Sequence, residues 1–413
     1  MNRVAITGIG IVSCLGRAPA EVQDALRHGR CGIGIDTNRV ALGFRSPLTG
    51  LIRNFDPGAA LSRKQRKTMP EFAVWAHAAA LDAVATAGLQ ADDLRNDRTG
   101  LIFGCDSSCQ SAVEQADLLR RLGETKSIGS GLIFRSMNST VTMNLNVLFG
   151  VRGACWTVSS ACSSGGHAVG QAADLIALGR QDRVLCGGAQ EITWEAMCSF
   201  DGLGAFSTRI DDPARASRPF DAGRDGLVPS GGAAALLLEN YDQARARQAR
   251  IYGEVLAYAF SSDGENLSVP SGDGLARAMS GALQRAGMSP STIDYICAHA
   301  TSTPAGDAAE AAAIAAVFGG ASPHVSSLKG MTGHELWMSG ASQVVYCALM
   351  ADGGFIAPNL NYEEPDESSR KIAVVRRTLE RPPRRALCNA AGFGGTNSCL
   401  LLGFDARKGD ARV

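Results

Sequence analysis

One cysteine lies in a context that suits nucleophilic chemistry. Cys162 stands between a β-branched run at residues 156–158, typical of the end of a buried strand, and apolar residues at helical spacing up to Gly179. The pattern predicts a strand-to-helix turn with Cys162 at the N-terminal end of the helix, where the helix dipole would lower the pKa of the thiol. Small neighbouring residues leave backbone N–H groups free to stabilise an oxyanion. A buried structural cysteine fits this position equally well.

Two histidines and a lysine are the candidate partners of this thiol. His299, Lys329 and His334 lie in loops directly after predicted strands. The carboxyl ends of parallel strands are where open α/β sheets place their active sites. Two of only six histidines in such small-residue loops is more than chance placement. Each histidine taken singly also fits a hydrogen-bonded structural role.

A cysteine with two histidines has three chemical uses. A cysteine protease or an amidase-type hydrolase needs one histidine and an orienting Asn or Asp. A carbon–carbon condensing enzyme needs the cysteine to hold an acyl group and two neutral donors to stabilise an enolate and its thioester oxygen. Two histidines without an obvious Asp partner favour the condensing enzyme. The glycine-rich loop 392–397 lacks the Lys and the following helix of a phosphate-binding loop, so we expect it to supply a backbone N–H beside the cysteine.

Strands and helices alternate along the chain, which predicts parallel sheets with helices on their faces. The alternation starts again at Ile251, so we expect an internally duplicated α/β fold. The predicted strands cover residues 4–7, 99–104, 156–158, 184–188, 251–259, 295–298 and 324–326. The predicted helices cover residues 21–27, 71–87, 111–122, 134–149, 168–179, 241–250, 274–286 and 307–318.

A G-x-G pair within residues 3–16 superficially suggests a dinucleotide-binding fingerprint. The third glycine of that fingerprint is missing, and we predict no strand after the helix at 21–27. We therefore expect a simple strand and turn there, without a bound cofactor.

Composition places the chain among ordinary globular proteins. Its 413 residues are 45% hydrophobic and 19% charged, and 40 basic residues balance 40 acidic ones, which argues against nucleic-acid binding and against a basic membrane-surface protein. The apolar run at 233–238 is too short to insert across a membrane, and we expect no cleaved leader before the first strand. Twelve scattered cysteines predict a reducing cytosol, and because Cys105 and Cys109 lack a second pair, we expect no metal site.

The densest basic cluster covers residues 62–67 and contains Arg63, Lys64 and Lys67. Such a cluster is usually a solvated face just before a helix. The functional alternative is a docking patch for an acidic partner.

Four motifs, in this order, resemble those of the β-ketoacyl-[acyl-carrier-protein] synthases. They are Ser-Ser-Ala-Cys-Ser-Ser around Cys162, His-Ala-Thr-Ser-Thr-Pro-Ala-Gly-Asp from His299, Lys-Gly-Met-Thr-Gly-His from Lys329, and Gly-Phe-Gly-Gly-Thr-Asn from Gly392. The resemblance runs from residue 1 to about residue 403. The pieces at 220–226 and 353–358 are most similar to the bacterial type I synthases of fatty-acid elongation.

The resemblance implies a thiolase-like α/β fold, an αβαβα sandwich of two similar halves. Residues 1–250 would form the N-terminal half with the nucleophilic cysteine, and residues 251–413 the C-terminal half with the histidine and lysine loops. It also implies a cytoplasmic acyltransferase, acting as a homodimer or as a heterodimer with a related subunit. Its partner would be an acyl carrier protein whose substrates carry phosphopantetheine, and neither a cofactor nor a metal is expected.

The same resemblance implies a decarboxylative Claisen condensation with a role for each motif residue. Cys162 would take the acyl chain, and His299 and His334 would bind the malonyl carrier protein and assist decarboxylation. Lys329 would order the histidines, and Thr301 and Thr303 would bond the pantetheine arm. The amides of Cys162 and Phe393 would form the oxyanion hole, and the ring of Phe393 would gate acyl entry. The residues that would dock the carrier are Arg63, Lys64 and Lys67.

The chain departs from the family's pattern around these motifs. Ala300 stands where the family has Gly, Gln343 where it has a Glu that partners the lysine, and Ala391 where it has Phe, while Trp337 and Met338 stand where it has Gly and Ala. Exchanging volume between neighbouring walls reshapes a tight pocket. We therefore weigh a fatty-acid enzyme against a relative in a specialised pathway that makes polyene, aryl polyene or polyketide-type chains.

Two expectations follow from these departures. Another acid must balance Lys329 in place of Gln343, or hydrogen bonds alone hold the lysine; Glu310, one helical turn after Asp307, is the candidate acid. The alternative to an active enzyme is a non-catalytic chain-length-factor-type subunit that pairs with a ketosynthase. Such subunits lack the nucleophile, and this chain has Cys162 with its full set of partners.

Overall fold

The computed structural model describes residues 1–56 and 60–404. Its first half contributes five strands to the main sheet, in the order β5-β4-β6-β7-β1. The strand β4 is parallel to β5 and β6, and β7 is antiparallel to β6 and β1. The bounds of these strands are Val4–Val12 for β1, Thr99–Gly104 for β4, Cys155–Val158 for β5, Arg183–Gln190 for β6 and Gly232–Asn240 for β7.

The second half repeats this arrangement in the order β10-β9-β12-β13-β8, with β11 added beyond β10. Counted along the chain, both halves have the strand order 3-2-4-5-1, and in both the fifth strand is the antiparallel one. The strands β1 and β8 pair and join the halves. The bounds are Gly253–Ser262 for β8, Tyr295–Cys297 for β9, His324–Ser326 for β10, Ala373–Val374 for β11, Arg385–Gly392 for β12 and Thr396–Gly403 for β13.

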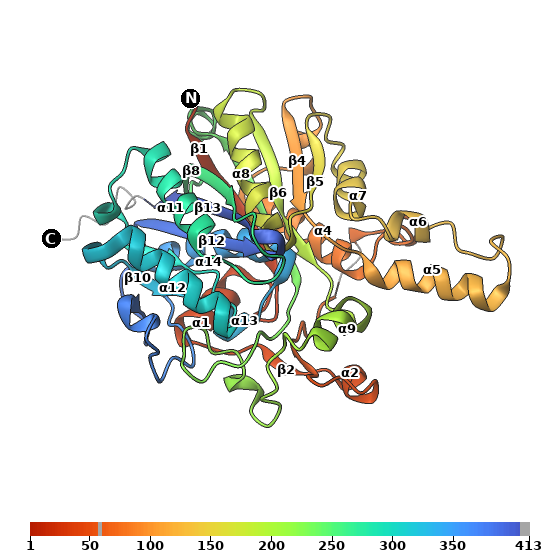
Figure 1. The fold of residues 1–413 in the computed structure, drawn as a ribbon. Helices are drawn as coiled ribbons and strands as arrows, with labels where there is room; N and C mark the ends of the chain where they lie inside the picture. Colours follow the sequence, from red (N-terminus) through yellow and green to blue (C-terminus); the bar gives the residue numbers. More distant parts are fainter. Residues whose placement is uncertain (57–59, 405–413) are drawn as a thin grey trace.

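Three layers of helices enclose the two half-sheets (Figure 1). The helices α8 (Ser164–Ala177) and α14 (Ser339–Gly353) lie between the half-sheets and share one apolar core with strands of both. The outer face of the first half-sheet is covered by α4 (Glu71–Thr86), and that of the second by α11 (Asp273–Ala286) and α12 (Pro304–Phe318). The predicted αβαβα sandwich of two similar halves is thereby confirmed.

The remaining elements are short or lie outside these layers, and α5 projects from the body of the molecule (Figure 1). Their bounds are Pro19–His28 for α1, Ile33–Ile35 for β2, Thr37–Ala41 for α2, Leu48–Gly50 for β3, Arg63–Arg66 for α3, Cys109–Leu122 for α5, Leu132–Arg135 for α6, Thr140–Phe149 for α7, Trp194–Leu203 for α9, Tyr241–Ala246 for α10 and Lys329–Thr332 for α13. The predicted boundary between residues 250 and 251 falls in the connection from α10 to β8 and stays a prediction.

The two central helices touch through glycine, and this contact brings the two halves of the site together. A Cβ atom on Gly340 of α14 would lie 2.4 Å from the backbone nitrogen of Gly166 on α8. Any larger residue at Gly340 would separate the helices. The turns that precede α8 and α14, which carry Cys162 and His334, therefore face one another.

The G-x-G pair of the first strand has a packing role. A Cβ atom on Gly8 would lie 2.0 Å from the carbonyl oxygen of Ala83, so the glycine lets β1 lie directly against α4. Close approach of strand and helix is what this glycine provides.

Four expectations about the elements were wrong. The helix predicted at 134–149 is two helices, α6 and α7; between them the hydroxyl of Ser136 donates to the carbonyl of Ile133, and the amide of Asn138 donates to the distant carbonyl of Asp106. The strand β5 is not buried: it is the edge of the sheet, and Trp156 is 40% exposed. A strand does follow α1, but β2 pairs only with β3, outside the main sheet. The helix α10 ends at Ala246 and not at 250.

Within the described ranges 1–56 and 60–404, no helix combines the length and the apolar character needed to traverse a lipid bilayer.

Candidate active site

The turn between β5 and α8 presents Cys162 as its central residue. Cys162 lies in a single 3-10 turn, Ala161–Ser163, and is 6% exposed. Ala161 has a φ of 46°, in the left-handed region that residues with a side chain seldom adopt. The carboxylate of Asp106 accepts a hydrogen bond from the N–H of Ala161 at 3.1 Å, and the hydroxyl of Ser164 accepts one from the N–H of Ser160 at 2.8 Å. These bonds hold the strained turn open toward the second half of the chain.

The second half contributes the two histidines. The Nε2 atom of His334 lies 3.1 Å from the Sγ atom of Cys162. The ring of His299 meets that of His334 edge to face, with 5.2 Å between the ring centres. The structure thus brings together, from loops after β5, β9 and β10, the thiol and the two histidines that the sequence placed at strand ends.

The proton of neutral His334 belongs on Nε2. Its Nδ1 atom accepts a hydrogen bond from the backbone N–H of Leu336 at 3.3 Å, and the hydroxyl of Ser339 lies 3.2 Å from the same atom. Because Nδ1 is an acceptor, Nε2 carries the hydrogen and points it at the sulfur of Cys162. His334 can therefore stabilise a thiolate or an oxyanion at this point as a donor.

Both histidines are neutral at ordinary pH. Burial holds the pKa of His334 well below its ordinary value, and the positive charge of Lys329 lowers it further. Burial and then Lys329 likewise hold the pKa of His299 well below its ordinary value. A neutral histidine is a hydrogen-bond donor that does not lose its role as the pH changes near neutrality.

The thiol of Cys162 differs from the sequence expectation. Burial raises the pKa of Cys162 to about 12, although the positive charge of Lys329 and the backbone N–H groups of Cys162 and Phe393 act to lower it. The prediction that the helix dipole lowers the pKa of Cys162 was therefore wrong for the protein without substrate, because the thiol is buried. The amides of Cys162 and Phe393 both act on this sulfur atom, and the oxyanion hole expected from them stays a prediction.

Lys329 is the buried cation beneath these groups. It begins α13, is 4% exposed, and has a pKa that burial lowers while the charges of Cys297, Glu310 and Glu335 oppose that effect. Glu310 therefore does act on the lysine, as predicted. Glu335 is a second acid that sequence reasoning missed, although it directly follows His334.

Glu335 is held in the core by hydroxyl groups. It accepts hydrogen bonds from the hydroxyls of Ser342 and Tyr346, the latter at 2.7 Å, and burial raises its pKa to about 7. At that pKa the carboxyl group is ionised in part near neutral pH, so it can share the balancing of Lys329 with Glu310.

Glu310 and Gln343 position the segment that ends in His299. The carboxylate of Glu310 accepts hydrogen bonds from the backbone N–H of His299 at 2.9 Å and of Ala300 at 2.6 Å. The amide of Gln343 donates to the carbonyl of Cys297 at 3.1 Å and to that of Ala298 at 2.9 Å. A glutamate could not donate to two carbonyl oxygens, so the amide at 343 is suited to its place.

A cavity of about 410 Å³ opens onto Cys162. His299, His334 and Phe393 line it next to the thiol, and Thr301 and Thr303 line its outer part with their hydroxyl oxygens 3.1 Å apart. Its remaining wall is largely apolar and comes from residues such as Leu203, Leu227, Leu267, Val269, Leu336 and Ala391. The cavity can hold a slender, mostly apolar arm that ends at the sulfur.

Phe393 stands at the mouth of this cavity. It is 40% exposed, stacks on Phe200 with 5.9 Å between the ring centres, and is followed by Gly394 with a φ of 78°. Glycine on both sides gives this short loop the conformational range that a moving ring needs. The hydroxyls of Ser160 and Thr396 lie 2.8 Å apart and tie the loop to the nucleophile turn.

Trp337 fills the space on the other side of the nucleophile. It is 7% exposed and packs in one apolar cluster with Cys162 and Phe206, and its indole N–H donates to the hydroxyl of Ser107 at 3.1 Å. The predicted bulk at this position therefore belongs to the same apolar cluster as the sulfur, while Ala391 lines the cavity.

The basic cluster is exposed on α3, away from the cavity lining. The hydroxyl and backbone of Ser62 form a capping box with Gln65, which fixes the short helix. Arg63, Lys64 and Lys67 are all exposed, and none has an ion pair with another residue of the described chain.

The sequence and the fold both match known proteins. The family "Beta-ketoacyl synthase, N-terminal domain" matches residues 1–244, and "Beta-ketoacyl synthase, C-terminal domain" matches residues 252–363. The chain is 39% identical over 405 residues to a 3-oxoacyl-[acyl-carrier-protein] synthase 1 of Haemophilus influenzae and, with the same identity and length, to that of Escherichia coli. Each match covers 97% of this chain and 99% of the relative.

Solved structures give the same picture. A β-ketoacyl synthase from Burkholderia phymatum is 34% identical with a TM-score of 0.93, and "the ishigamide ketosynthase/chain length factor" is 32% identical with a TM-score of 0.91. A type II PKS acyl-carrier protein in complex with its ketosynthase, bound to the hexaketide, gives 29% identity and a TM-score of 0.89. All three cover 98% of this chain and 100% of the matched chain, which confirms the thiolase-like fold.

Proposed function

The chain belongs to the β-ketoacyl synthase family, and on that premise we propose that it condenses an acyl group held on Cys162 with malonyl-acyl carrier protein. The product is 3-oxoacyl-acyl carrier protein, and the enzyme is an acyltransferase. One observation carries the proposal: the 3.1 Å contact between the thiol of Cys162 and the Nε2–H of a neutral His334, with neutral His299 beside it in the same cavity.

In the first half-reaction, the sulfur of Cys162 attacks the acyl thioester on the carrier's phosphopantetheine. The new carbon–sulfur bond forms at Cys162, the carbon–sulfur bond to pantetheine breaks, and the carrier leaves as its thiol. The amides of Cys162 and Phe393 stabilise the oxyanion. Lys329 and the Nε2–H of His334 stabilise the thiolate, which offsets part of the cost of burial.

In the second half-reaction, the malonyl thioester enters along the same cavity. His299 and His334 donate hydrogen bonds to its thioester carbonyl, so that loss of carbon dioxide leaves a stabilised enolate. The enolate carbon attacks the acyl carbonyl on Cys162, the carbon–carbon bond forms, and the carbon–sulfur bond breaks. Thr301 and Thr303 bond the pantetheine arm from the outer part of the cavity.

The acyl carrier protein is the proposed partner at α3. Acyl carrier proteins are acidic, and Arg63, Lys64 and Lys67 offer an exposed positive surface without competing ion pairs among the described residues. The substrates bring phosphopantetheine with them. Because the thiol of Cys162 and eleven further cysteines are free, a reducing cytoplasm is the proposed location.

A second copy of the chain is the proposed partner at β5. This edge strand pairs on one side only with β4, and its Cys155 and Trp156 are exposed. Exposed apolar side chains continue from it over the neighbouring helices: Val113, Leu119, Leu122, Ile133, Phe134, Met137 and Val147. Sedimentation of wild type and of Trp156→Asp tests this interface, and a wild-type monomer, or one that associates only with a related subunit, overturns the homodimer.

Two classes of acyl chain are candidate substrates. The bulky Trp337 packs in one cluster with Cys162, and the small Ala391 lines the cavity, so we favour a stiff polyunsaturated or aryl-capped chain over a flexible saturated one. Competition between matched saturated and conjugated acyl carriers measures the preference. A higher kcat/KM for the saturated chain leaves fatty-acid elongation as the function.

The condensation is tested with a panel of acyl carrier proteins plus malonyl carrier protein, read by intact mass. The expected products are 3-oxoacyl carriers lengthened by two carbons, formed by wild type and not by Cys162→Ala. Product that appears only after a second, related subunit is added would support the non-catalytic partner role instead.

A further inference from the structure

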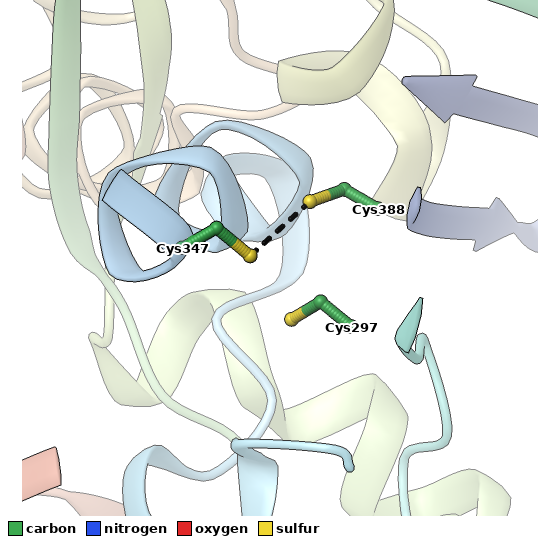
Figure 2. Close-up of side chains that lie close together, drawn as sticks. All are labelled: Cys297, Cys347 and Cys388. Carbon is green, nitrogen blue, oxygen red and sulfur yellow. Dashed lines mark hydrogen bonds between the residues drawn. The ribbon is translucent and has the colours of Figure 1, made fainter. Parts of the chain in front are cut away.

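Three cysteines of the second half meet in the core behind the histidine loop. Cys297 ends β9, Cys347 lies on α14, and Cys388 lies on β12 (Figure 2). All three are buried, their sulfur atoms lie within 4.8 Å of one another, and the sulfurs of Cys347 and Cys388 are 3.6 Å apart. None of them takes part in the proposed reaction.

The spacing of the three sulfurs suits a single bound ion. Metal–thiolate bonds are about 2.3 Å long, so three sulfurs around one ion lie about 4 Å apart. The 3.6 Å separation of Cys347 and Cys388 and the 4.8 Å limit on the other two separations are compatible with that value, and Figure 2 shows the three side chains converging on a common point. A disulfide would use two of these sulfurs and leave the third without a role, whereas a metal ion uses all three.

The ligand set also selects the kind of ion. Thiolates are soft ligands, which favour Cu(I) and Zn(II) over harder ions. A structural zinc site has four ligands, and among the described residues no fourth His, Cys, Asp or Glu joins this group. We propose that Cys297, Cys347 and Cys388 form a three-coordinate site for a copper(I) ion.

The surroundings favour the charge that such a site carries. Three thiols bind Cu(I) with the release of three protons, and no electron is transferred; the tris-thiolate complex carries a net charge of −2. Lys329 lies close enough for its positive charge to act on Cys297, and the hydroxyl of Tyr295 hydrogen-bonds to the same sulfur. Each offsets part of the cost of a buried anion.

The ion would join three elements that support the catalytic histidines. Cys297 precedes His299 by two residues, and Gln343, one turn before Cys347 on α14, already donates to the carbonyl of Cys297. Copper would therefore connect β9, β12 and α14 at the base of the histidine loop. Ligation that exists only in the folded state raises the free energy of unfolding.

The test measures binding of Cu(I) under anaerobic conditions, against a competing copper(I) chelator. All proteins carry Cys162→Ala, Cys155→Ser and Cys198→Ser, so that neither the nucleophile nor the two exposed thiols bind copper. Because the site is buried, the ion is added both to folded protein and during refolding. We expect one tightly held copper per chain, with three sulfur ligands by X-ray absorption.

Copper binding is compared between variants of the three cysteines and a matched control. Cys347→Ser and Cys388→Ser should weaken copper binding at least tenfold and lose the rise in Tm that copper gives the parent. Cys399→Ser, which removes an equally buried thiol on β13 outside the group, should keep both. Circular dichroism confirms folding, and Cys388→Ala replaces any serine variant that fails to fold.

The site would be overturned by copper retained equally by the cluster variants, by coordination by two sulfurs only, or by binding of Zn(II) with no binding of Cu(I). Loss of copper under mild chelator competition by the parent protein would likewise mean that the three cysteines pack as small apolar side chains.

Discussion

The two halves of the molecule share one strand order, yet they carry different chemistry at matching positions. In each half the third strand leads into a helix of the central layer. After β5 the connection is a single turn that presents Cys162, whereas after β10 it is longer and holds Lys329 and His334 before α14. The duplicated scaffold aims both connections at one point, and the loop residues alone decide what each half does there.

The second and fourth strands extend the comparison. The loop after β4 supplies Asp106, which holds the nucleophile turn, and the loop after β9 supplies His299, which faces the substrate cavity. The connection from β12 to β13 is the short loop with Phe393, while that from β6 to β7 is long and includes α9. In the proposed reaction the first half would hold the acyl group and the second would supply the histidines for decarboxylation, and the first three predictions below separate these two tasks.

The largest effect should come from removing the thiol that the first half contributes. Cys162→Ala should lower condensation roughly a thousandfold or more, because no other group can hold the acyl chain. The turn is held by Asp106 and Ser164 and not by the thiol, so Tm should change little. Rates of product formation and intact mass of the enzyme measure this. An Ala variant that still elongates acyl chains at near wild-type rate would assign the nucleophile elsewhere.

Decarboxylation, the task of the second half, should slow when the carboxylate that positions His299 is removed. Glu310→Gln loses a carboxylate that accepts from two backbone N–H groups, and the amide of the new side chain would oppose one of them. Decarboxylation of malonyl carrier should fall about a hundredfold, as expected for a misplaced catalytic group, while acylation of Cys162 stays near normal. Asp273→Asn, at the exposed start of α11, is the control. Equal loss of both half-reactions would show that Glu310 serves the whole fold.

The two halves should also respond differently to pH. The pKa of Cys162 is raised to about 12, so its thiolate fraction grows about tenfold per pH unit up to that value, and the rate of acylation should rise between about pH 6 and pH 9. The pKa values of His299 and His334 are lowered, so both stay neutral over this range and decarboxylation should not decline at the acid end. Stopped-flow rates of the separate half-reactions measure this. An acid limb near pH 6.5 in decarboxylation would mean that a histidine titrates normally.

A smaller effect is expected at the docking surface, which serves both tasks equally. Replacing Arg63, Lys64 and Lys67 by Glu should raise KM for acyl and malonyl carriers about tenfold, mainly through slower association, and leave kcat unchanged. Raising the salt concentration should weaken wild-type binding in the same direction. The matched control replaces Arg370 and Lys371, which are exposed on the second half, by Glu. Salt-independent binding that survives the reversal would place the carrier elsewhere.

Much of this arrangement could be predicted from local pattern. The helices at 71–86 and 273–286 have clear boundaries, and the motif residues stand at strand ends, so their meeting follows from the topology. The helix α14 was not predicted, because a helix buried on every side has no polar face to give a period. The exposure of β5 could not be predicted either, since a short β-branched run has the same sequence pattern at the edge of a sheet as in its centre.

What could not be predicted about the site depends on burial and on contacts distant in sequence. The helix start favoured a lowered pKa for Cys162, but the surrounding core decides the sign. The role of Glu335 was missed because its partners, Ser342 and Tyr346, lie on the buried helix. The three-cysteine cluster was missed because its members are 41 or more residues apart, and the most closely spaced pair in the sequence, Cys105 and Cys109, is not part of it.

The division of labour between the halves is tested most directly by single turnovers of His299→Ala. Acyl carrier and malonyl carrier are mixed with the variant, and intact mass of the enzyme is read alongside release of carbon dioxide. We expect that Cys162 carries the acyl group to the same extent as in wild type, while neither carbon dioxide nor 3-oxoacyl carrier appears. A variant that releases carbon dioxide at the wild-type rate, or that loses acylation of Cys162 instead, would contradict it.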